Sequence, residues 1–145
     1  MKNLFRLPLL IVTLYSCAPD KRVKSKKCPE KWRLVKMTGS RGADPMTGAD
    51  MDWQEWYLLN PDKTFTKTRN QDNRIIEENG TYSSFTLIDG KFLELIYPSQ
   101  NELIGNCTTE SVETLIVKSK KEMMNICVAC DGPGLFYEKA DYACD

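Results

Sequence analysis

From Cys28 onward, the sequence is a succession of short segments in which apolar and polar residues alternate, separated by turn signals. Val, Ile, Thr and aromatic residues are concentrated in these segments, as is usual for β-strands. No stretch of ten or more residues shows the spacing of apolar side chains that an amphipathic helix needs. Eight or nine short strands at intervals of roughly ten residues are typical of an antiparallel sandwich or barrel. The pattern therefore predicts an all-β fold.

Two tight turns order these strands into hairpins. Asn60-Pro61-Asp62-Lys63 separates segments 53–59 and 64–69, and Asp89-Gly90 separates segments 81–88 and 91–97. Sequential hairpins favour up-and-down connectivity, so an antiparallel meander is expected. The other expected strands are 31–37, 102–108, 112–119, 122–129 and 135–139, and Thr38–Asp52 is expected to form a long polar loop.

Four short motifs resemble the lipocalin-like domains of small secreted bacterial lipoproteins. In chain order they are Lys31-Trp32-Arg33-Leu34-Val35, Asn60-Pro61-Asp62-Lys63-Thr64-Phe65, Asn79-Gly80-Thr81-Tyr82 and Leu135-Phe136-Tyr137-Glu138-Lys139. The resemblance covers residues 28–140. It implies an up-and-down β-barrel of eight to nine strands, with loop 38–52 placed as the lid over the barrel mouth.

The N-terminus carries a processing signal. Lys2 and Arg6 precede the apolar run 7–14, which is too short to cross a bilayer as a helix. The run ends in Leu14-Tyr15-Ser16-Cys17, which resembles the lipobox of bacterial lipoproteins, where a peptidase cuts before a cysteine that becomes lipid-modified. This resemblance implies a signal peptide at 1–16, lipid attachment at Cys17 and a lipid-anchored protein of the bacterial cell envelope. An ordinary signal peptide that ends near a cysteine is the alternative.

Charge divides the chain after this signal. Residues 17–27 are rich in Lys and Arg and contain a single aliphatic residue larger than alanine, so they are expected to form a solvated tether ahead of a barrel domain at 28–145. The full chain has 20 Lys+Arg, 20 Asp+Glu and no His. It therefore lacks the basic footprint of nucleic-acid binding and the commonest acid–base and metal-ligand side chain. We expect a monomeric, non-enzymatic binding protein without a cofactor, metal or nucleic-acid partner.

The cysteines predict two disulfides. Acylation of Cys17 leaves five thiols in an oxidising compartment, which allows at most two intramolecular bridges. Cys28 and Cys144 bracket the domain and form the first expected pair. A hairpin turn at 120–121 places Cys130 opposite Ser111, close to Cys107, so Cys107 and Cys130 form the second. Cys127 is then a buried free thiol on a strand, although Cys127 and Cys130 can exchange roles.

The barrel allows two kinds of binding. An eight-stranded barrel is either filled by its own side chains or holds one small ligand. For a small apolar ligand, the expected lining residues are Trp56, Leu58, Leu93, Leu95 and Tyr97, and the cations expected at the rim to meet a carboxylate are Lys67, Arg69 and Arg74. A filled barrel would instead bind a protein partner through an exposed apolar patch, expected around Trp53, Trp56 and the first long loop.

A thiol–disulfide redox pair and a calcium site are two less favoured alternatives. Cys127-Val128-Ala129-Cys130 has the spacing of a thiol–disulfide redox pair, but the next residues form a turn where the thioredoxin motif needs a helix. Asp44, Asp50 and Asp52 offer oxygen ligands to calcium without the spacing of an EF-hand loop. We therefore expect structural disulfides and a solvated loop at these places.

Overall fold

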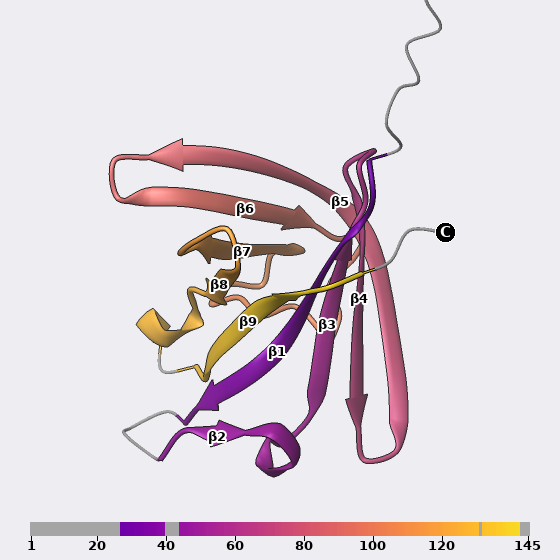
Figure 1. The fold of residues 1–145 in the computed structure, drawn as a ribbon, viewed down its shortest axis with the longest axis vertical. Helices are drawn as coiled ribbons and strands as arrows, with labels where there is room; N and C mark the ends of the chain where they lie inside the picture. The colour runs from indigo at the N-terminus through magenta and orange to yellow at the C-terminus, as the bar shows by residue number, and fades with distance from the viewer. Residues whose placement is uncertain (1–26, 40–43, 131, 143–145) are drawn as a thin grey trace, which may run out of the picture.

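The structure, a computed structural model, describes residues 27–39, 44–130 and 132–142. Cys17, Cys144 and the predicted signal peptide lie outside these residues. The described part contains strands and two 3-10 turns but no α-helix (Figure 1). The elements are β1 (Glu30–Thr38), β2 (Met46–Thr47), η1 (Gly48–Asp50), β3 (Gln54–Leu59), β4 (Thr64–Gln71), β5 (Arg74–Leu87), β6 (Gly90–Ile96), β7 (Val112–Val117), β8 (Glu122–Asn125), η2 (Cys127–Cys130) and β9 (Gly134–Ala140).

The strands form one antiparallel sheet that closes on itself. Each strand from β3 to β8 pairs with the next in the chain, β1 pairs with β3, and β1 also pairs with β9. The two-residue β2 adds to the far end of β1, beyond its pairing with β3. The predicted all-β, up-and-down barrel is therefore confirmed. No helix in the described ranges has the length and apolarity to cross a bilayer.

Strand β5 differs most from the sequence prediction. It is one strand of 14 residues that starts at Arg74 and runs through Asn79-Gly80, whereas the sequence predicted a strand only over 81–88. The turn before it is Asp72-Asn73, whose φ angles of 51° and 61° suit the two-residue hairpin turn that Asp and Asn favour. Leu87 pairs with Gly90, so the turn after it is Ile88-Asp89 and not Asp89-Gly90.

Gly80 is a point of close packing inside this strand. A Cβ atom at Gly80 would lie 2.6 Å from the Phe65 ring and even closer to the carbonyl oxygen of Ile96. Strand β5 bends along its length, and its second part forms with β6 a long arm across one end of the barrel (Figure 1). Glycine is needed at position 80 because the backbone of Ile96 and the ring of Phe65 approach it too closely for a side chain. A glycine in the sequence can indicate such a close contact as well as a turn.

Two other expected strands are shorter or missing. Residues 102–108 belong to the loop between β6 and β7, and β8 ends at Asn125, after which residues 127–130 form η2. Asn125 explains this ending, because its side chain accepts a hydrogen bond from the Leu135 amide and donates one to the carbonyl of Pro133. Loop 38–52 also holds more order than expected, since it contains β2 and η1.

One apolar cluster fills the barrel between its walls. Its largest members are Trp32 of β1, Tyr57 of β3, Phe65 of β4, Tyr97 directly after β6, and Tyr137 of β9. Tyr57 and Tyr137 meet edge to face with centroids 5.0 Å apart, and Phe65 and Tyr97 do so at 4.9 Å. The interior is therefore occupied by aromatic and aliphatic side chains of the chain itself.

Candidate functional site

A buried ionic cluster lies among these aromatic residues. The Lys67 ammonium on β4 is fully buried and lies 3.0 Å from Glu113 of β7 and 3.3 Å from Glu55 of β3. It also donates a hydrogen bond to the carbonyl oxygen of Leu103 in the β6–β7 loop. Both carboxylates are fully buried. A charge in this environment is tolerated only when it is paired and hydrogen-bonded, and Lys67 meets that condition.

The remaining oxygens of the two carboxylates are satisfied by other donors. Arg69 donates from Nε to Glu55 at 2.7 Å, and the Tyr137 hydroxyl donates to the same carboxylate at 2.5 Å. The Tyr97 hydroxyl donates to Glu113 at 2.6 Å, and the amide of Gly105 donates to it at 3.1 Å. Two cations therefore balance two anions, and the cluster needs no further charged partner.

Burial keeps the tyrosines of the cluster protonated. It is the main cause that raises the pKa of Tyr57, Tyr97 and Tyr137 well above the ordinary value, and the charge of Glu113 raises all three further. The raised pKa values keep Tyr97 and Tyr137 as hydrogen-bond donors. The Tyr57 hydroxyl has no hydrogen-bond partner among the described residues, and Lys67 Nζ lies 4.9 Å from the centre of its ring.

The cations expected at the barrel rim occupy three different environments. Lys67 is inside the barrel, and Arg69 is largely buried against Glu55. Only Arg74 is solvent-exposed, with its guanidinium 4.0 Å from Glu102. The prediction of a cationic rim for a ligand carboxylate is therefore corrected, because the protein's own glutamates already neutralise Lys67 and Arg69.

The residues expected to line a ligand cavity divide between the two faces of the sheet. Leu93, Leu95 and Tyr97 belong to the core cluster. On β3, however, Glu55, Tyr57 and Leu59 point into the barrel, whereas Trp56 and Leu58 lie on the outer face. The sequence prediction that Trp56 and Leu58 line the interior is therefore corrected. These two residues form the more apolar set of β3, but the set that contains Glu55 lies inside because Glu55 pairs with Lys67 and Arg69.

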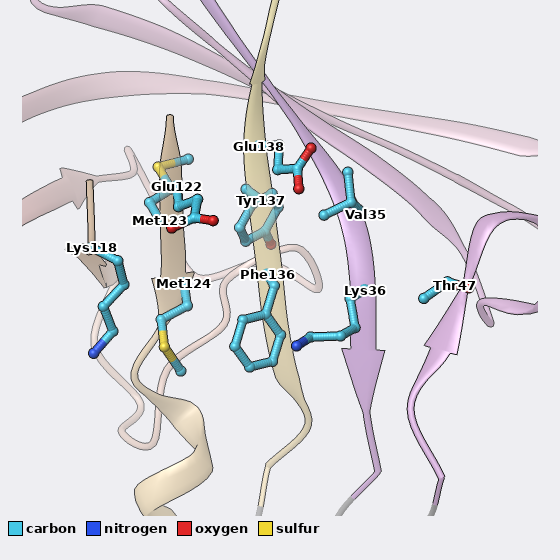
Figure 2. A pocket seen from close by; sticks show the side chains of 10 residues that line it. All are labelled: Val35, Lys36, Thr47, Lys118, Glu122, Met123, Met124, Phe136, Tyr137 and Glu138. Carbon is cyan, nitrogen blue, oxygen red and sulfur yellow. The ribbon is translucent and has the colours of Figure 1, made fainter. Parts of the chain in front are cut away.

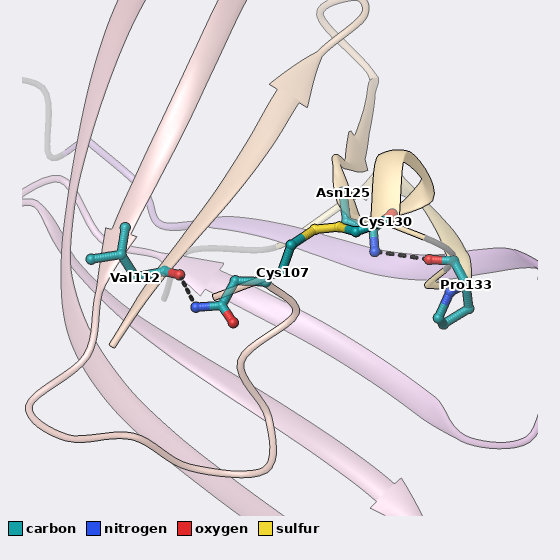
Figure 3. The surroundings of a disulfide bond; sticks show 6 residues. Cys107, Val112, Asn125, Cys130 and Pro133 are labelled. Carbon is teal, nitrogen blue, oxygen red and sulfur yellow. Dashed lines mark hydrogen bonds between the residues drawn. A yellow bond between two sulfur atoms is a disulfide. The ribbon is translucent and has the colours of Figure 1, made fainter. Parts of the chain in front are cut away.

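A disulfide closes the barrel end nearest this cluster. Cys107 in the β6–β7 loop is bonded to Cys130 of η2, with Cα atoms 6.0 Å apart (Figure 3). The same loop supplies the Leu103 carbonyl and the Gly105 amide to Lys67 and Glu113. The predicted Cys107–Cys130 pair is thus present. It links the two connections that cover this end, while the Cys28–Cys144 pair stays a prediction because Cys144 lies outside the described residues.

Cys127 is a buried free thiol, as expected, but it lies at the start of η2 and not on a strand. Burial raises its pKa, and the charge of Glu113 adds to this effect. A reactive thiol has a lowered pKa and an accessible sulfur, so this environment is the opposite of an activating one. Cys130 is bonded to Cys107, so the Cys127–Cys130 redox pair is not formed here.

The outer face of the barrel carries a continuous apolar row, which we call the outer row. Phe85 pairs across the sheet with Phe92, Phe92 with Ile116, Ile116 with Met124, and Met124 with Phe136. The Phe85 and Phe92 rings stack with centroids 5.4 Å apart. Directly paired residues share one face of a sheet, so these five side chains form a stripe from β5 to β9.

The outer row ends in a groove on β8, β9 and β1 with a volume of about 450 Å³ (Figure 2). Val35, Met124 and Phe136 provide its apolar lining, and the Lys36 ammonium lies 3.9 Å from the centre of the Phe136 ring. Figure 2 shows Lys36 and Lys118 at one end of the groove, and Glu122 and Glu138 at the other. The groove is therefore apolar along its length and oppositely charged at its ends.

The other surface features expected from the sequence do not gather into a site. Trp53 and Trp56 are half-buried, and each ring is covered by a cation, Arg69 for Trp53 and Lys31 for Trp56. They do not form the exposed apolar patch that was expected. In the described ranges, no group of three or more acidic, cysteine or histidine side chains is arranged to hold a metal ion, so Asp44, Asp50 and Asp52 form no such cluster.

Comparison of the chain with protein-family models, curated proteins and solved structures gives no significant match. The class of the protein is therefore defined by its architecture: a small closed up-and-down barrel whose described interior is filled by an ionic and aromatic core.

Proposed function

We propose that this protein is a lipid-anchored binding module of the bacterial cell envelope that recognises a protein partner through the outer row and its groove. The observation that carries the proposal is the contrast between the two faces of one wall. Inside, Glu113 and Leu115 of β7 are fully buried; outside, Ile116 of the same strand continues an apolar stripe. Phe92 is buried within the stripe, whereas Phe85, Ile116, Met124 and Phe136 are at least partly exposed. Contiguous exposed apolar residues on a small domain usually mark an interaction surface.

The occupation of the interior supports this choice over a small apolar ligand in the barrel. Such a ligand would have to lie beside Leu93, Leu95 and Tyr97, which pack against the core cluster. It would also displace groups around Lys67 whose hydrogen bonds satisfy buried charges. Loss of one partner from a buried charged pair costs about 3–5 kcal/mol, and this cost would weaken the binding of such a ligand.

The charges of the groove indicate the chemistry of the partner. Its surface should present an apolar segment that covers Met124 and Phe136, with an acidic group near Lys118 and a basic group near Glu122 or Glu138. Electrostatic complementarity of this kind sets the orientation and the association rate of a complex. The lipid anchor at Cys17, which the lipobox resemblance implies, would hold the module at a membrane where an envelope partner is concentrated.

The decisive experiment compares two outward apolar residues, Phe136 of β9 in the groove and Leu58 of β3, which lies outside the groove on the other side of β1. The full chain is isolated from its host envelope with either Phe136→Asp or Leu58→Asp, and complexes are measured by native mass spectrometry and cross-linking. We expect Phe136→Asp to abolish a stoichiometric protein complex and Leu58→Asp to retain it. Equal behaviour of both variants, or a bound small molecule in place of a protein, would overturn the proposal. The circular dichroism spectrum of each variant verifies the fold.

A further inference from the structure

The two ends of the barrel carry opposite charge. We name as the entry end the connections 27–29, 60–63, 88–89, 118–121 and 141–142, because the described chain enters there at Lys27. The far end consists of the described residues in 39–53, 72–73, 97–111 and 126–133. In an up-and-down barrel the connections alternate between the two ends, so this division follows directly from the topology.

Basic residues gather at the entry end and acidic residues at the far end. The entry-end connections contain the lysines Lys27, Lys63, Lys118, Lys120 and Lys121 and the acids Asp62, Asp89 and Asp141. The described residues of the far end contain the acids Asp44, Asp50, Asp52, Asp72, Glu102 and Glu110 and neither lysine nor arginine. The described connections at the two ends therefore carry opposite net charge, although the charge of the whole chain is zero and Arg74, at the start of β5, lies 4.0 Å from Glu102 of the far end.

The entry-end lysines are close in space as well as in topology. Lys120 and Lys121 line one hollow together with Cys28 and Glu30 at the start of β1. Lys27 and Lys63 line a second hollow, which also contains Glu30. Both hollows share Cys28 and Glu30, so they are neighbours on one end of the molecule. This end presents a basic surface around the point where the described chain begins.

An exposed apolar tip adds to the basic surface. Ile88, at the turn between β5 and β6, is completely exposed, and Leu87 beside it is 55% exposed. The arm that carries them lies across the same end of the barrel as the start of β1 (Figure 1). Lys91 of β6 pairs with Val117, so the arm also lies next to the lysine-rich turn 118–121. Apolar tips flanked by lysines are typical of surfaces that rest in the headgroup region of a bilayer.

From these observations we infer that the entry end is a membrane-contact surface, which docks on an anionic lipid bilayer with Ile88 inserted between the headgroups and four lysines over them, namely Lys27, Lys63, Lys120 and Lys121. The chain outside the described structure agrees with this orientation. Residues 1–26 join the barrel at Lys27, and residues 21–26 of that segment are mostly basic. A bilayer that holds the N-terminal segment is therefore nearest to the entry end. The acidic far end is repelled by the same surface.

This inference rests on the proposed attachment to the membrane and adds an orientation to it. The barrel would not swing freely on its tether. Its acidic far end, with the disulfide between Cys107 and Cys130, would point away from the bilayer. The groove on β8, β9 and β1 is on the side wall, so it would remain open to a partner.

Hydrogen exchange of the full chain on vesicles tests the orientation. The probes are vesicles of phosphatidylcholine alone and vesicles of phosphatidylcholine with phosphatidylglycerol. We expect slower amide exchange in turns 60–63, 88–89 and 118–121 on the anionic vesicles, with unchanged exchange at 72–73 and 98–111. Protection at the far end, or none that depends on lipid charge, would overturn the inference. Failure to associate with either vesicle would instead refute the attachment itself.

Two matched pairs of variants separate local contact from total charge and hydrophobicity. Lys120→Gln/Lys121→Gln should lower the ratio of anionic to neutral vesicle partitioning by about 25-fold, since each lysine near an anionic surface contributes about fivefold. Arg33→Gln/Arg74→Gln removes the same charge from exposed positions on the strands and should change the ratio far less. Ile88→Ser should weaken binding by roughly tenfold, whereas Ile75→Ser, at an exposed residue near the far end, should not. Equal effects within either pair would contradict the inference, and exchange rates without vesicles verify folding.

Discussion

The hydroxyl of Tyr137 donates a hydrogen bond of 2.5 Å to the carboxylate of Glu55, although the two residues are 82 positions apart. The bond crosses the interior from β9 to β3, which flank β1 on either side. Both partners are fully buried. It therefore links the last strand of the barrel to one of the first, at the seam where β1 and β9 close the sheet.

Replacing Tyr137 by Phe should destabilise the fold without changing its shape. The substitution removes only the hydroxyl, so Glu55 loses one donor and keeps Arg69 and Lys67. Loss of a hydrogen bond to a buried charge costs about 1.5–3 kcal/mol. Urea denaturation should show this decrease in the free energy of unfolding. Tyr142→Phe, at an exposed residue, is the control and should change it by less than about 0.5 kcal/mol.

Replacing Lys67 by Met should have a larger effect. Met fills a similar volume but leaves Glu113 without its cation in a buried site. A single buried charge that loses its partner typically costs about 3–5 kcal/mol, measured by the same denaturation. The double variant Lys67→Met/Glu113→Gln should recover part of this loss, because the unpaired charge is removed. If the single variant were as stable as the parent chain, Lys67 and Glu113 would not form the cluster described.

The face assignment on β3 is tested by a pair of neighbouring leucines. Leu59→Asp places a carboxylate in the core, whereas Leu58→Asp places one on the outer face. An unpaired buried charge is among the few changes that cost more than about 4 kcal/mol, so Leu59→Asp should unfold the domain. Leu58→Asp should retain the cooperative transition. The opposite ranking would restore the interior role that the sequence suggested for Leu58.

The sequence predicts the barrel well and its interior poorly, for one physical reason. Alternation and turn residues are local signals, and they locate β1, β3, β4, β6, β7 and β9 to within two residues. The inward side of β3 depends instead on Lys67 and Arg69, which lie on β4 and pair with Glu55. From the sequence alone, a buried glutamate cannot be distinguished from a solvated one, because its cationic partner is not known. The same holds for Gly80, whose close neighbours Phe65 and Ile96 are brought to it only by the fold.

The outer row could not be predicted from the sequence either. Its residues come from five strands, and no two of Phe92, Ile116, Met124 and Phe136 are close in the chain. Only the register between strands brings them together. By contrast, the Cys107–Cys130 bond was predictable because the hairpin of β7 and β8 brings the connections before β7 and after β8 to the same end of the barrel, although its register differs by one residue from the turn predicted at 120–121.

Removing the Cys107–Cys130 bond should loosen the far end of the barrel. The bond joins residues 23 positions apart, and the chain-entropy model assigns a loop of this size roughly 3–4 kcal/mol. Cys107→Ser/Cys130→Ser should lower the unfolding free energy by up to this amount and speed amide exchange in 98–111. Cys127→Ala is the control, because Cys127 is a free thiol and its replacement leaves the bond intact. No change in exchange at 98–111 would show that the loop is held without the bond.

The buried tyrosines should make the protein sensitive to alkali. In the unfolded chain a tyrosine loses its proton near pH 10, but burial and Glu113 raise the pKa of Tyr57, Tyr97 and Tyr137 in the folded state. Above about pH 10 the unfolded state therefore binds fewer protons, and stability falls as the pH rises. The limit is about 1.4 kcal/mol per pH unit for each tyrosine, or about 4 kcal/mol for three.

Two measurements check this alkaline response. Tyrosinate absorbance should show Tyr57, Tyr97 and Tyr137 ionising only as the protein unfolds. In denaturant titrations between about pH 10 and 11.5, Tyr97→Phe should reduce the slope of stability against pH by up to about 1.4 kcal/mol per unit, because one group no longer contributes. Tyr142→Phe should leave the slope unchanged, since that side chain is exposed. A flat profile up to pH 11 would mean that solvent reaches the cluster, and the filled interior on which the proposed function depends would then have to be abandoned.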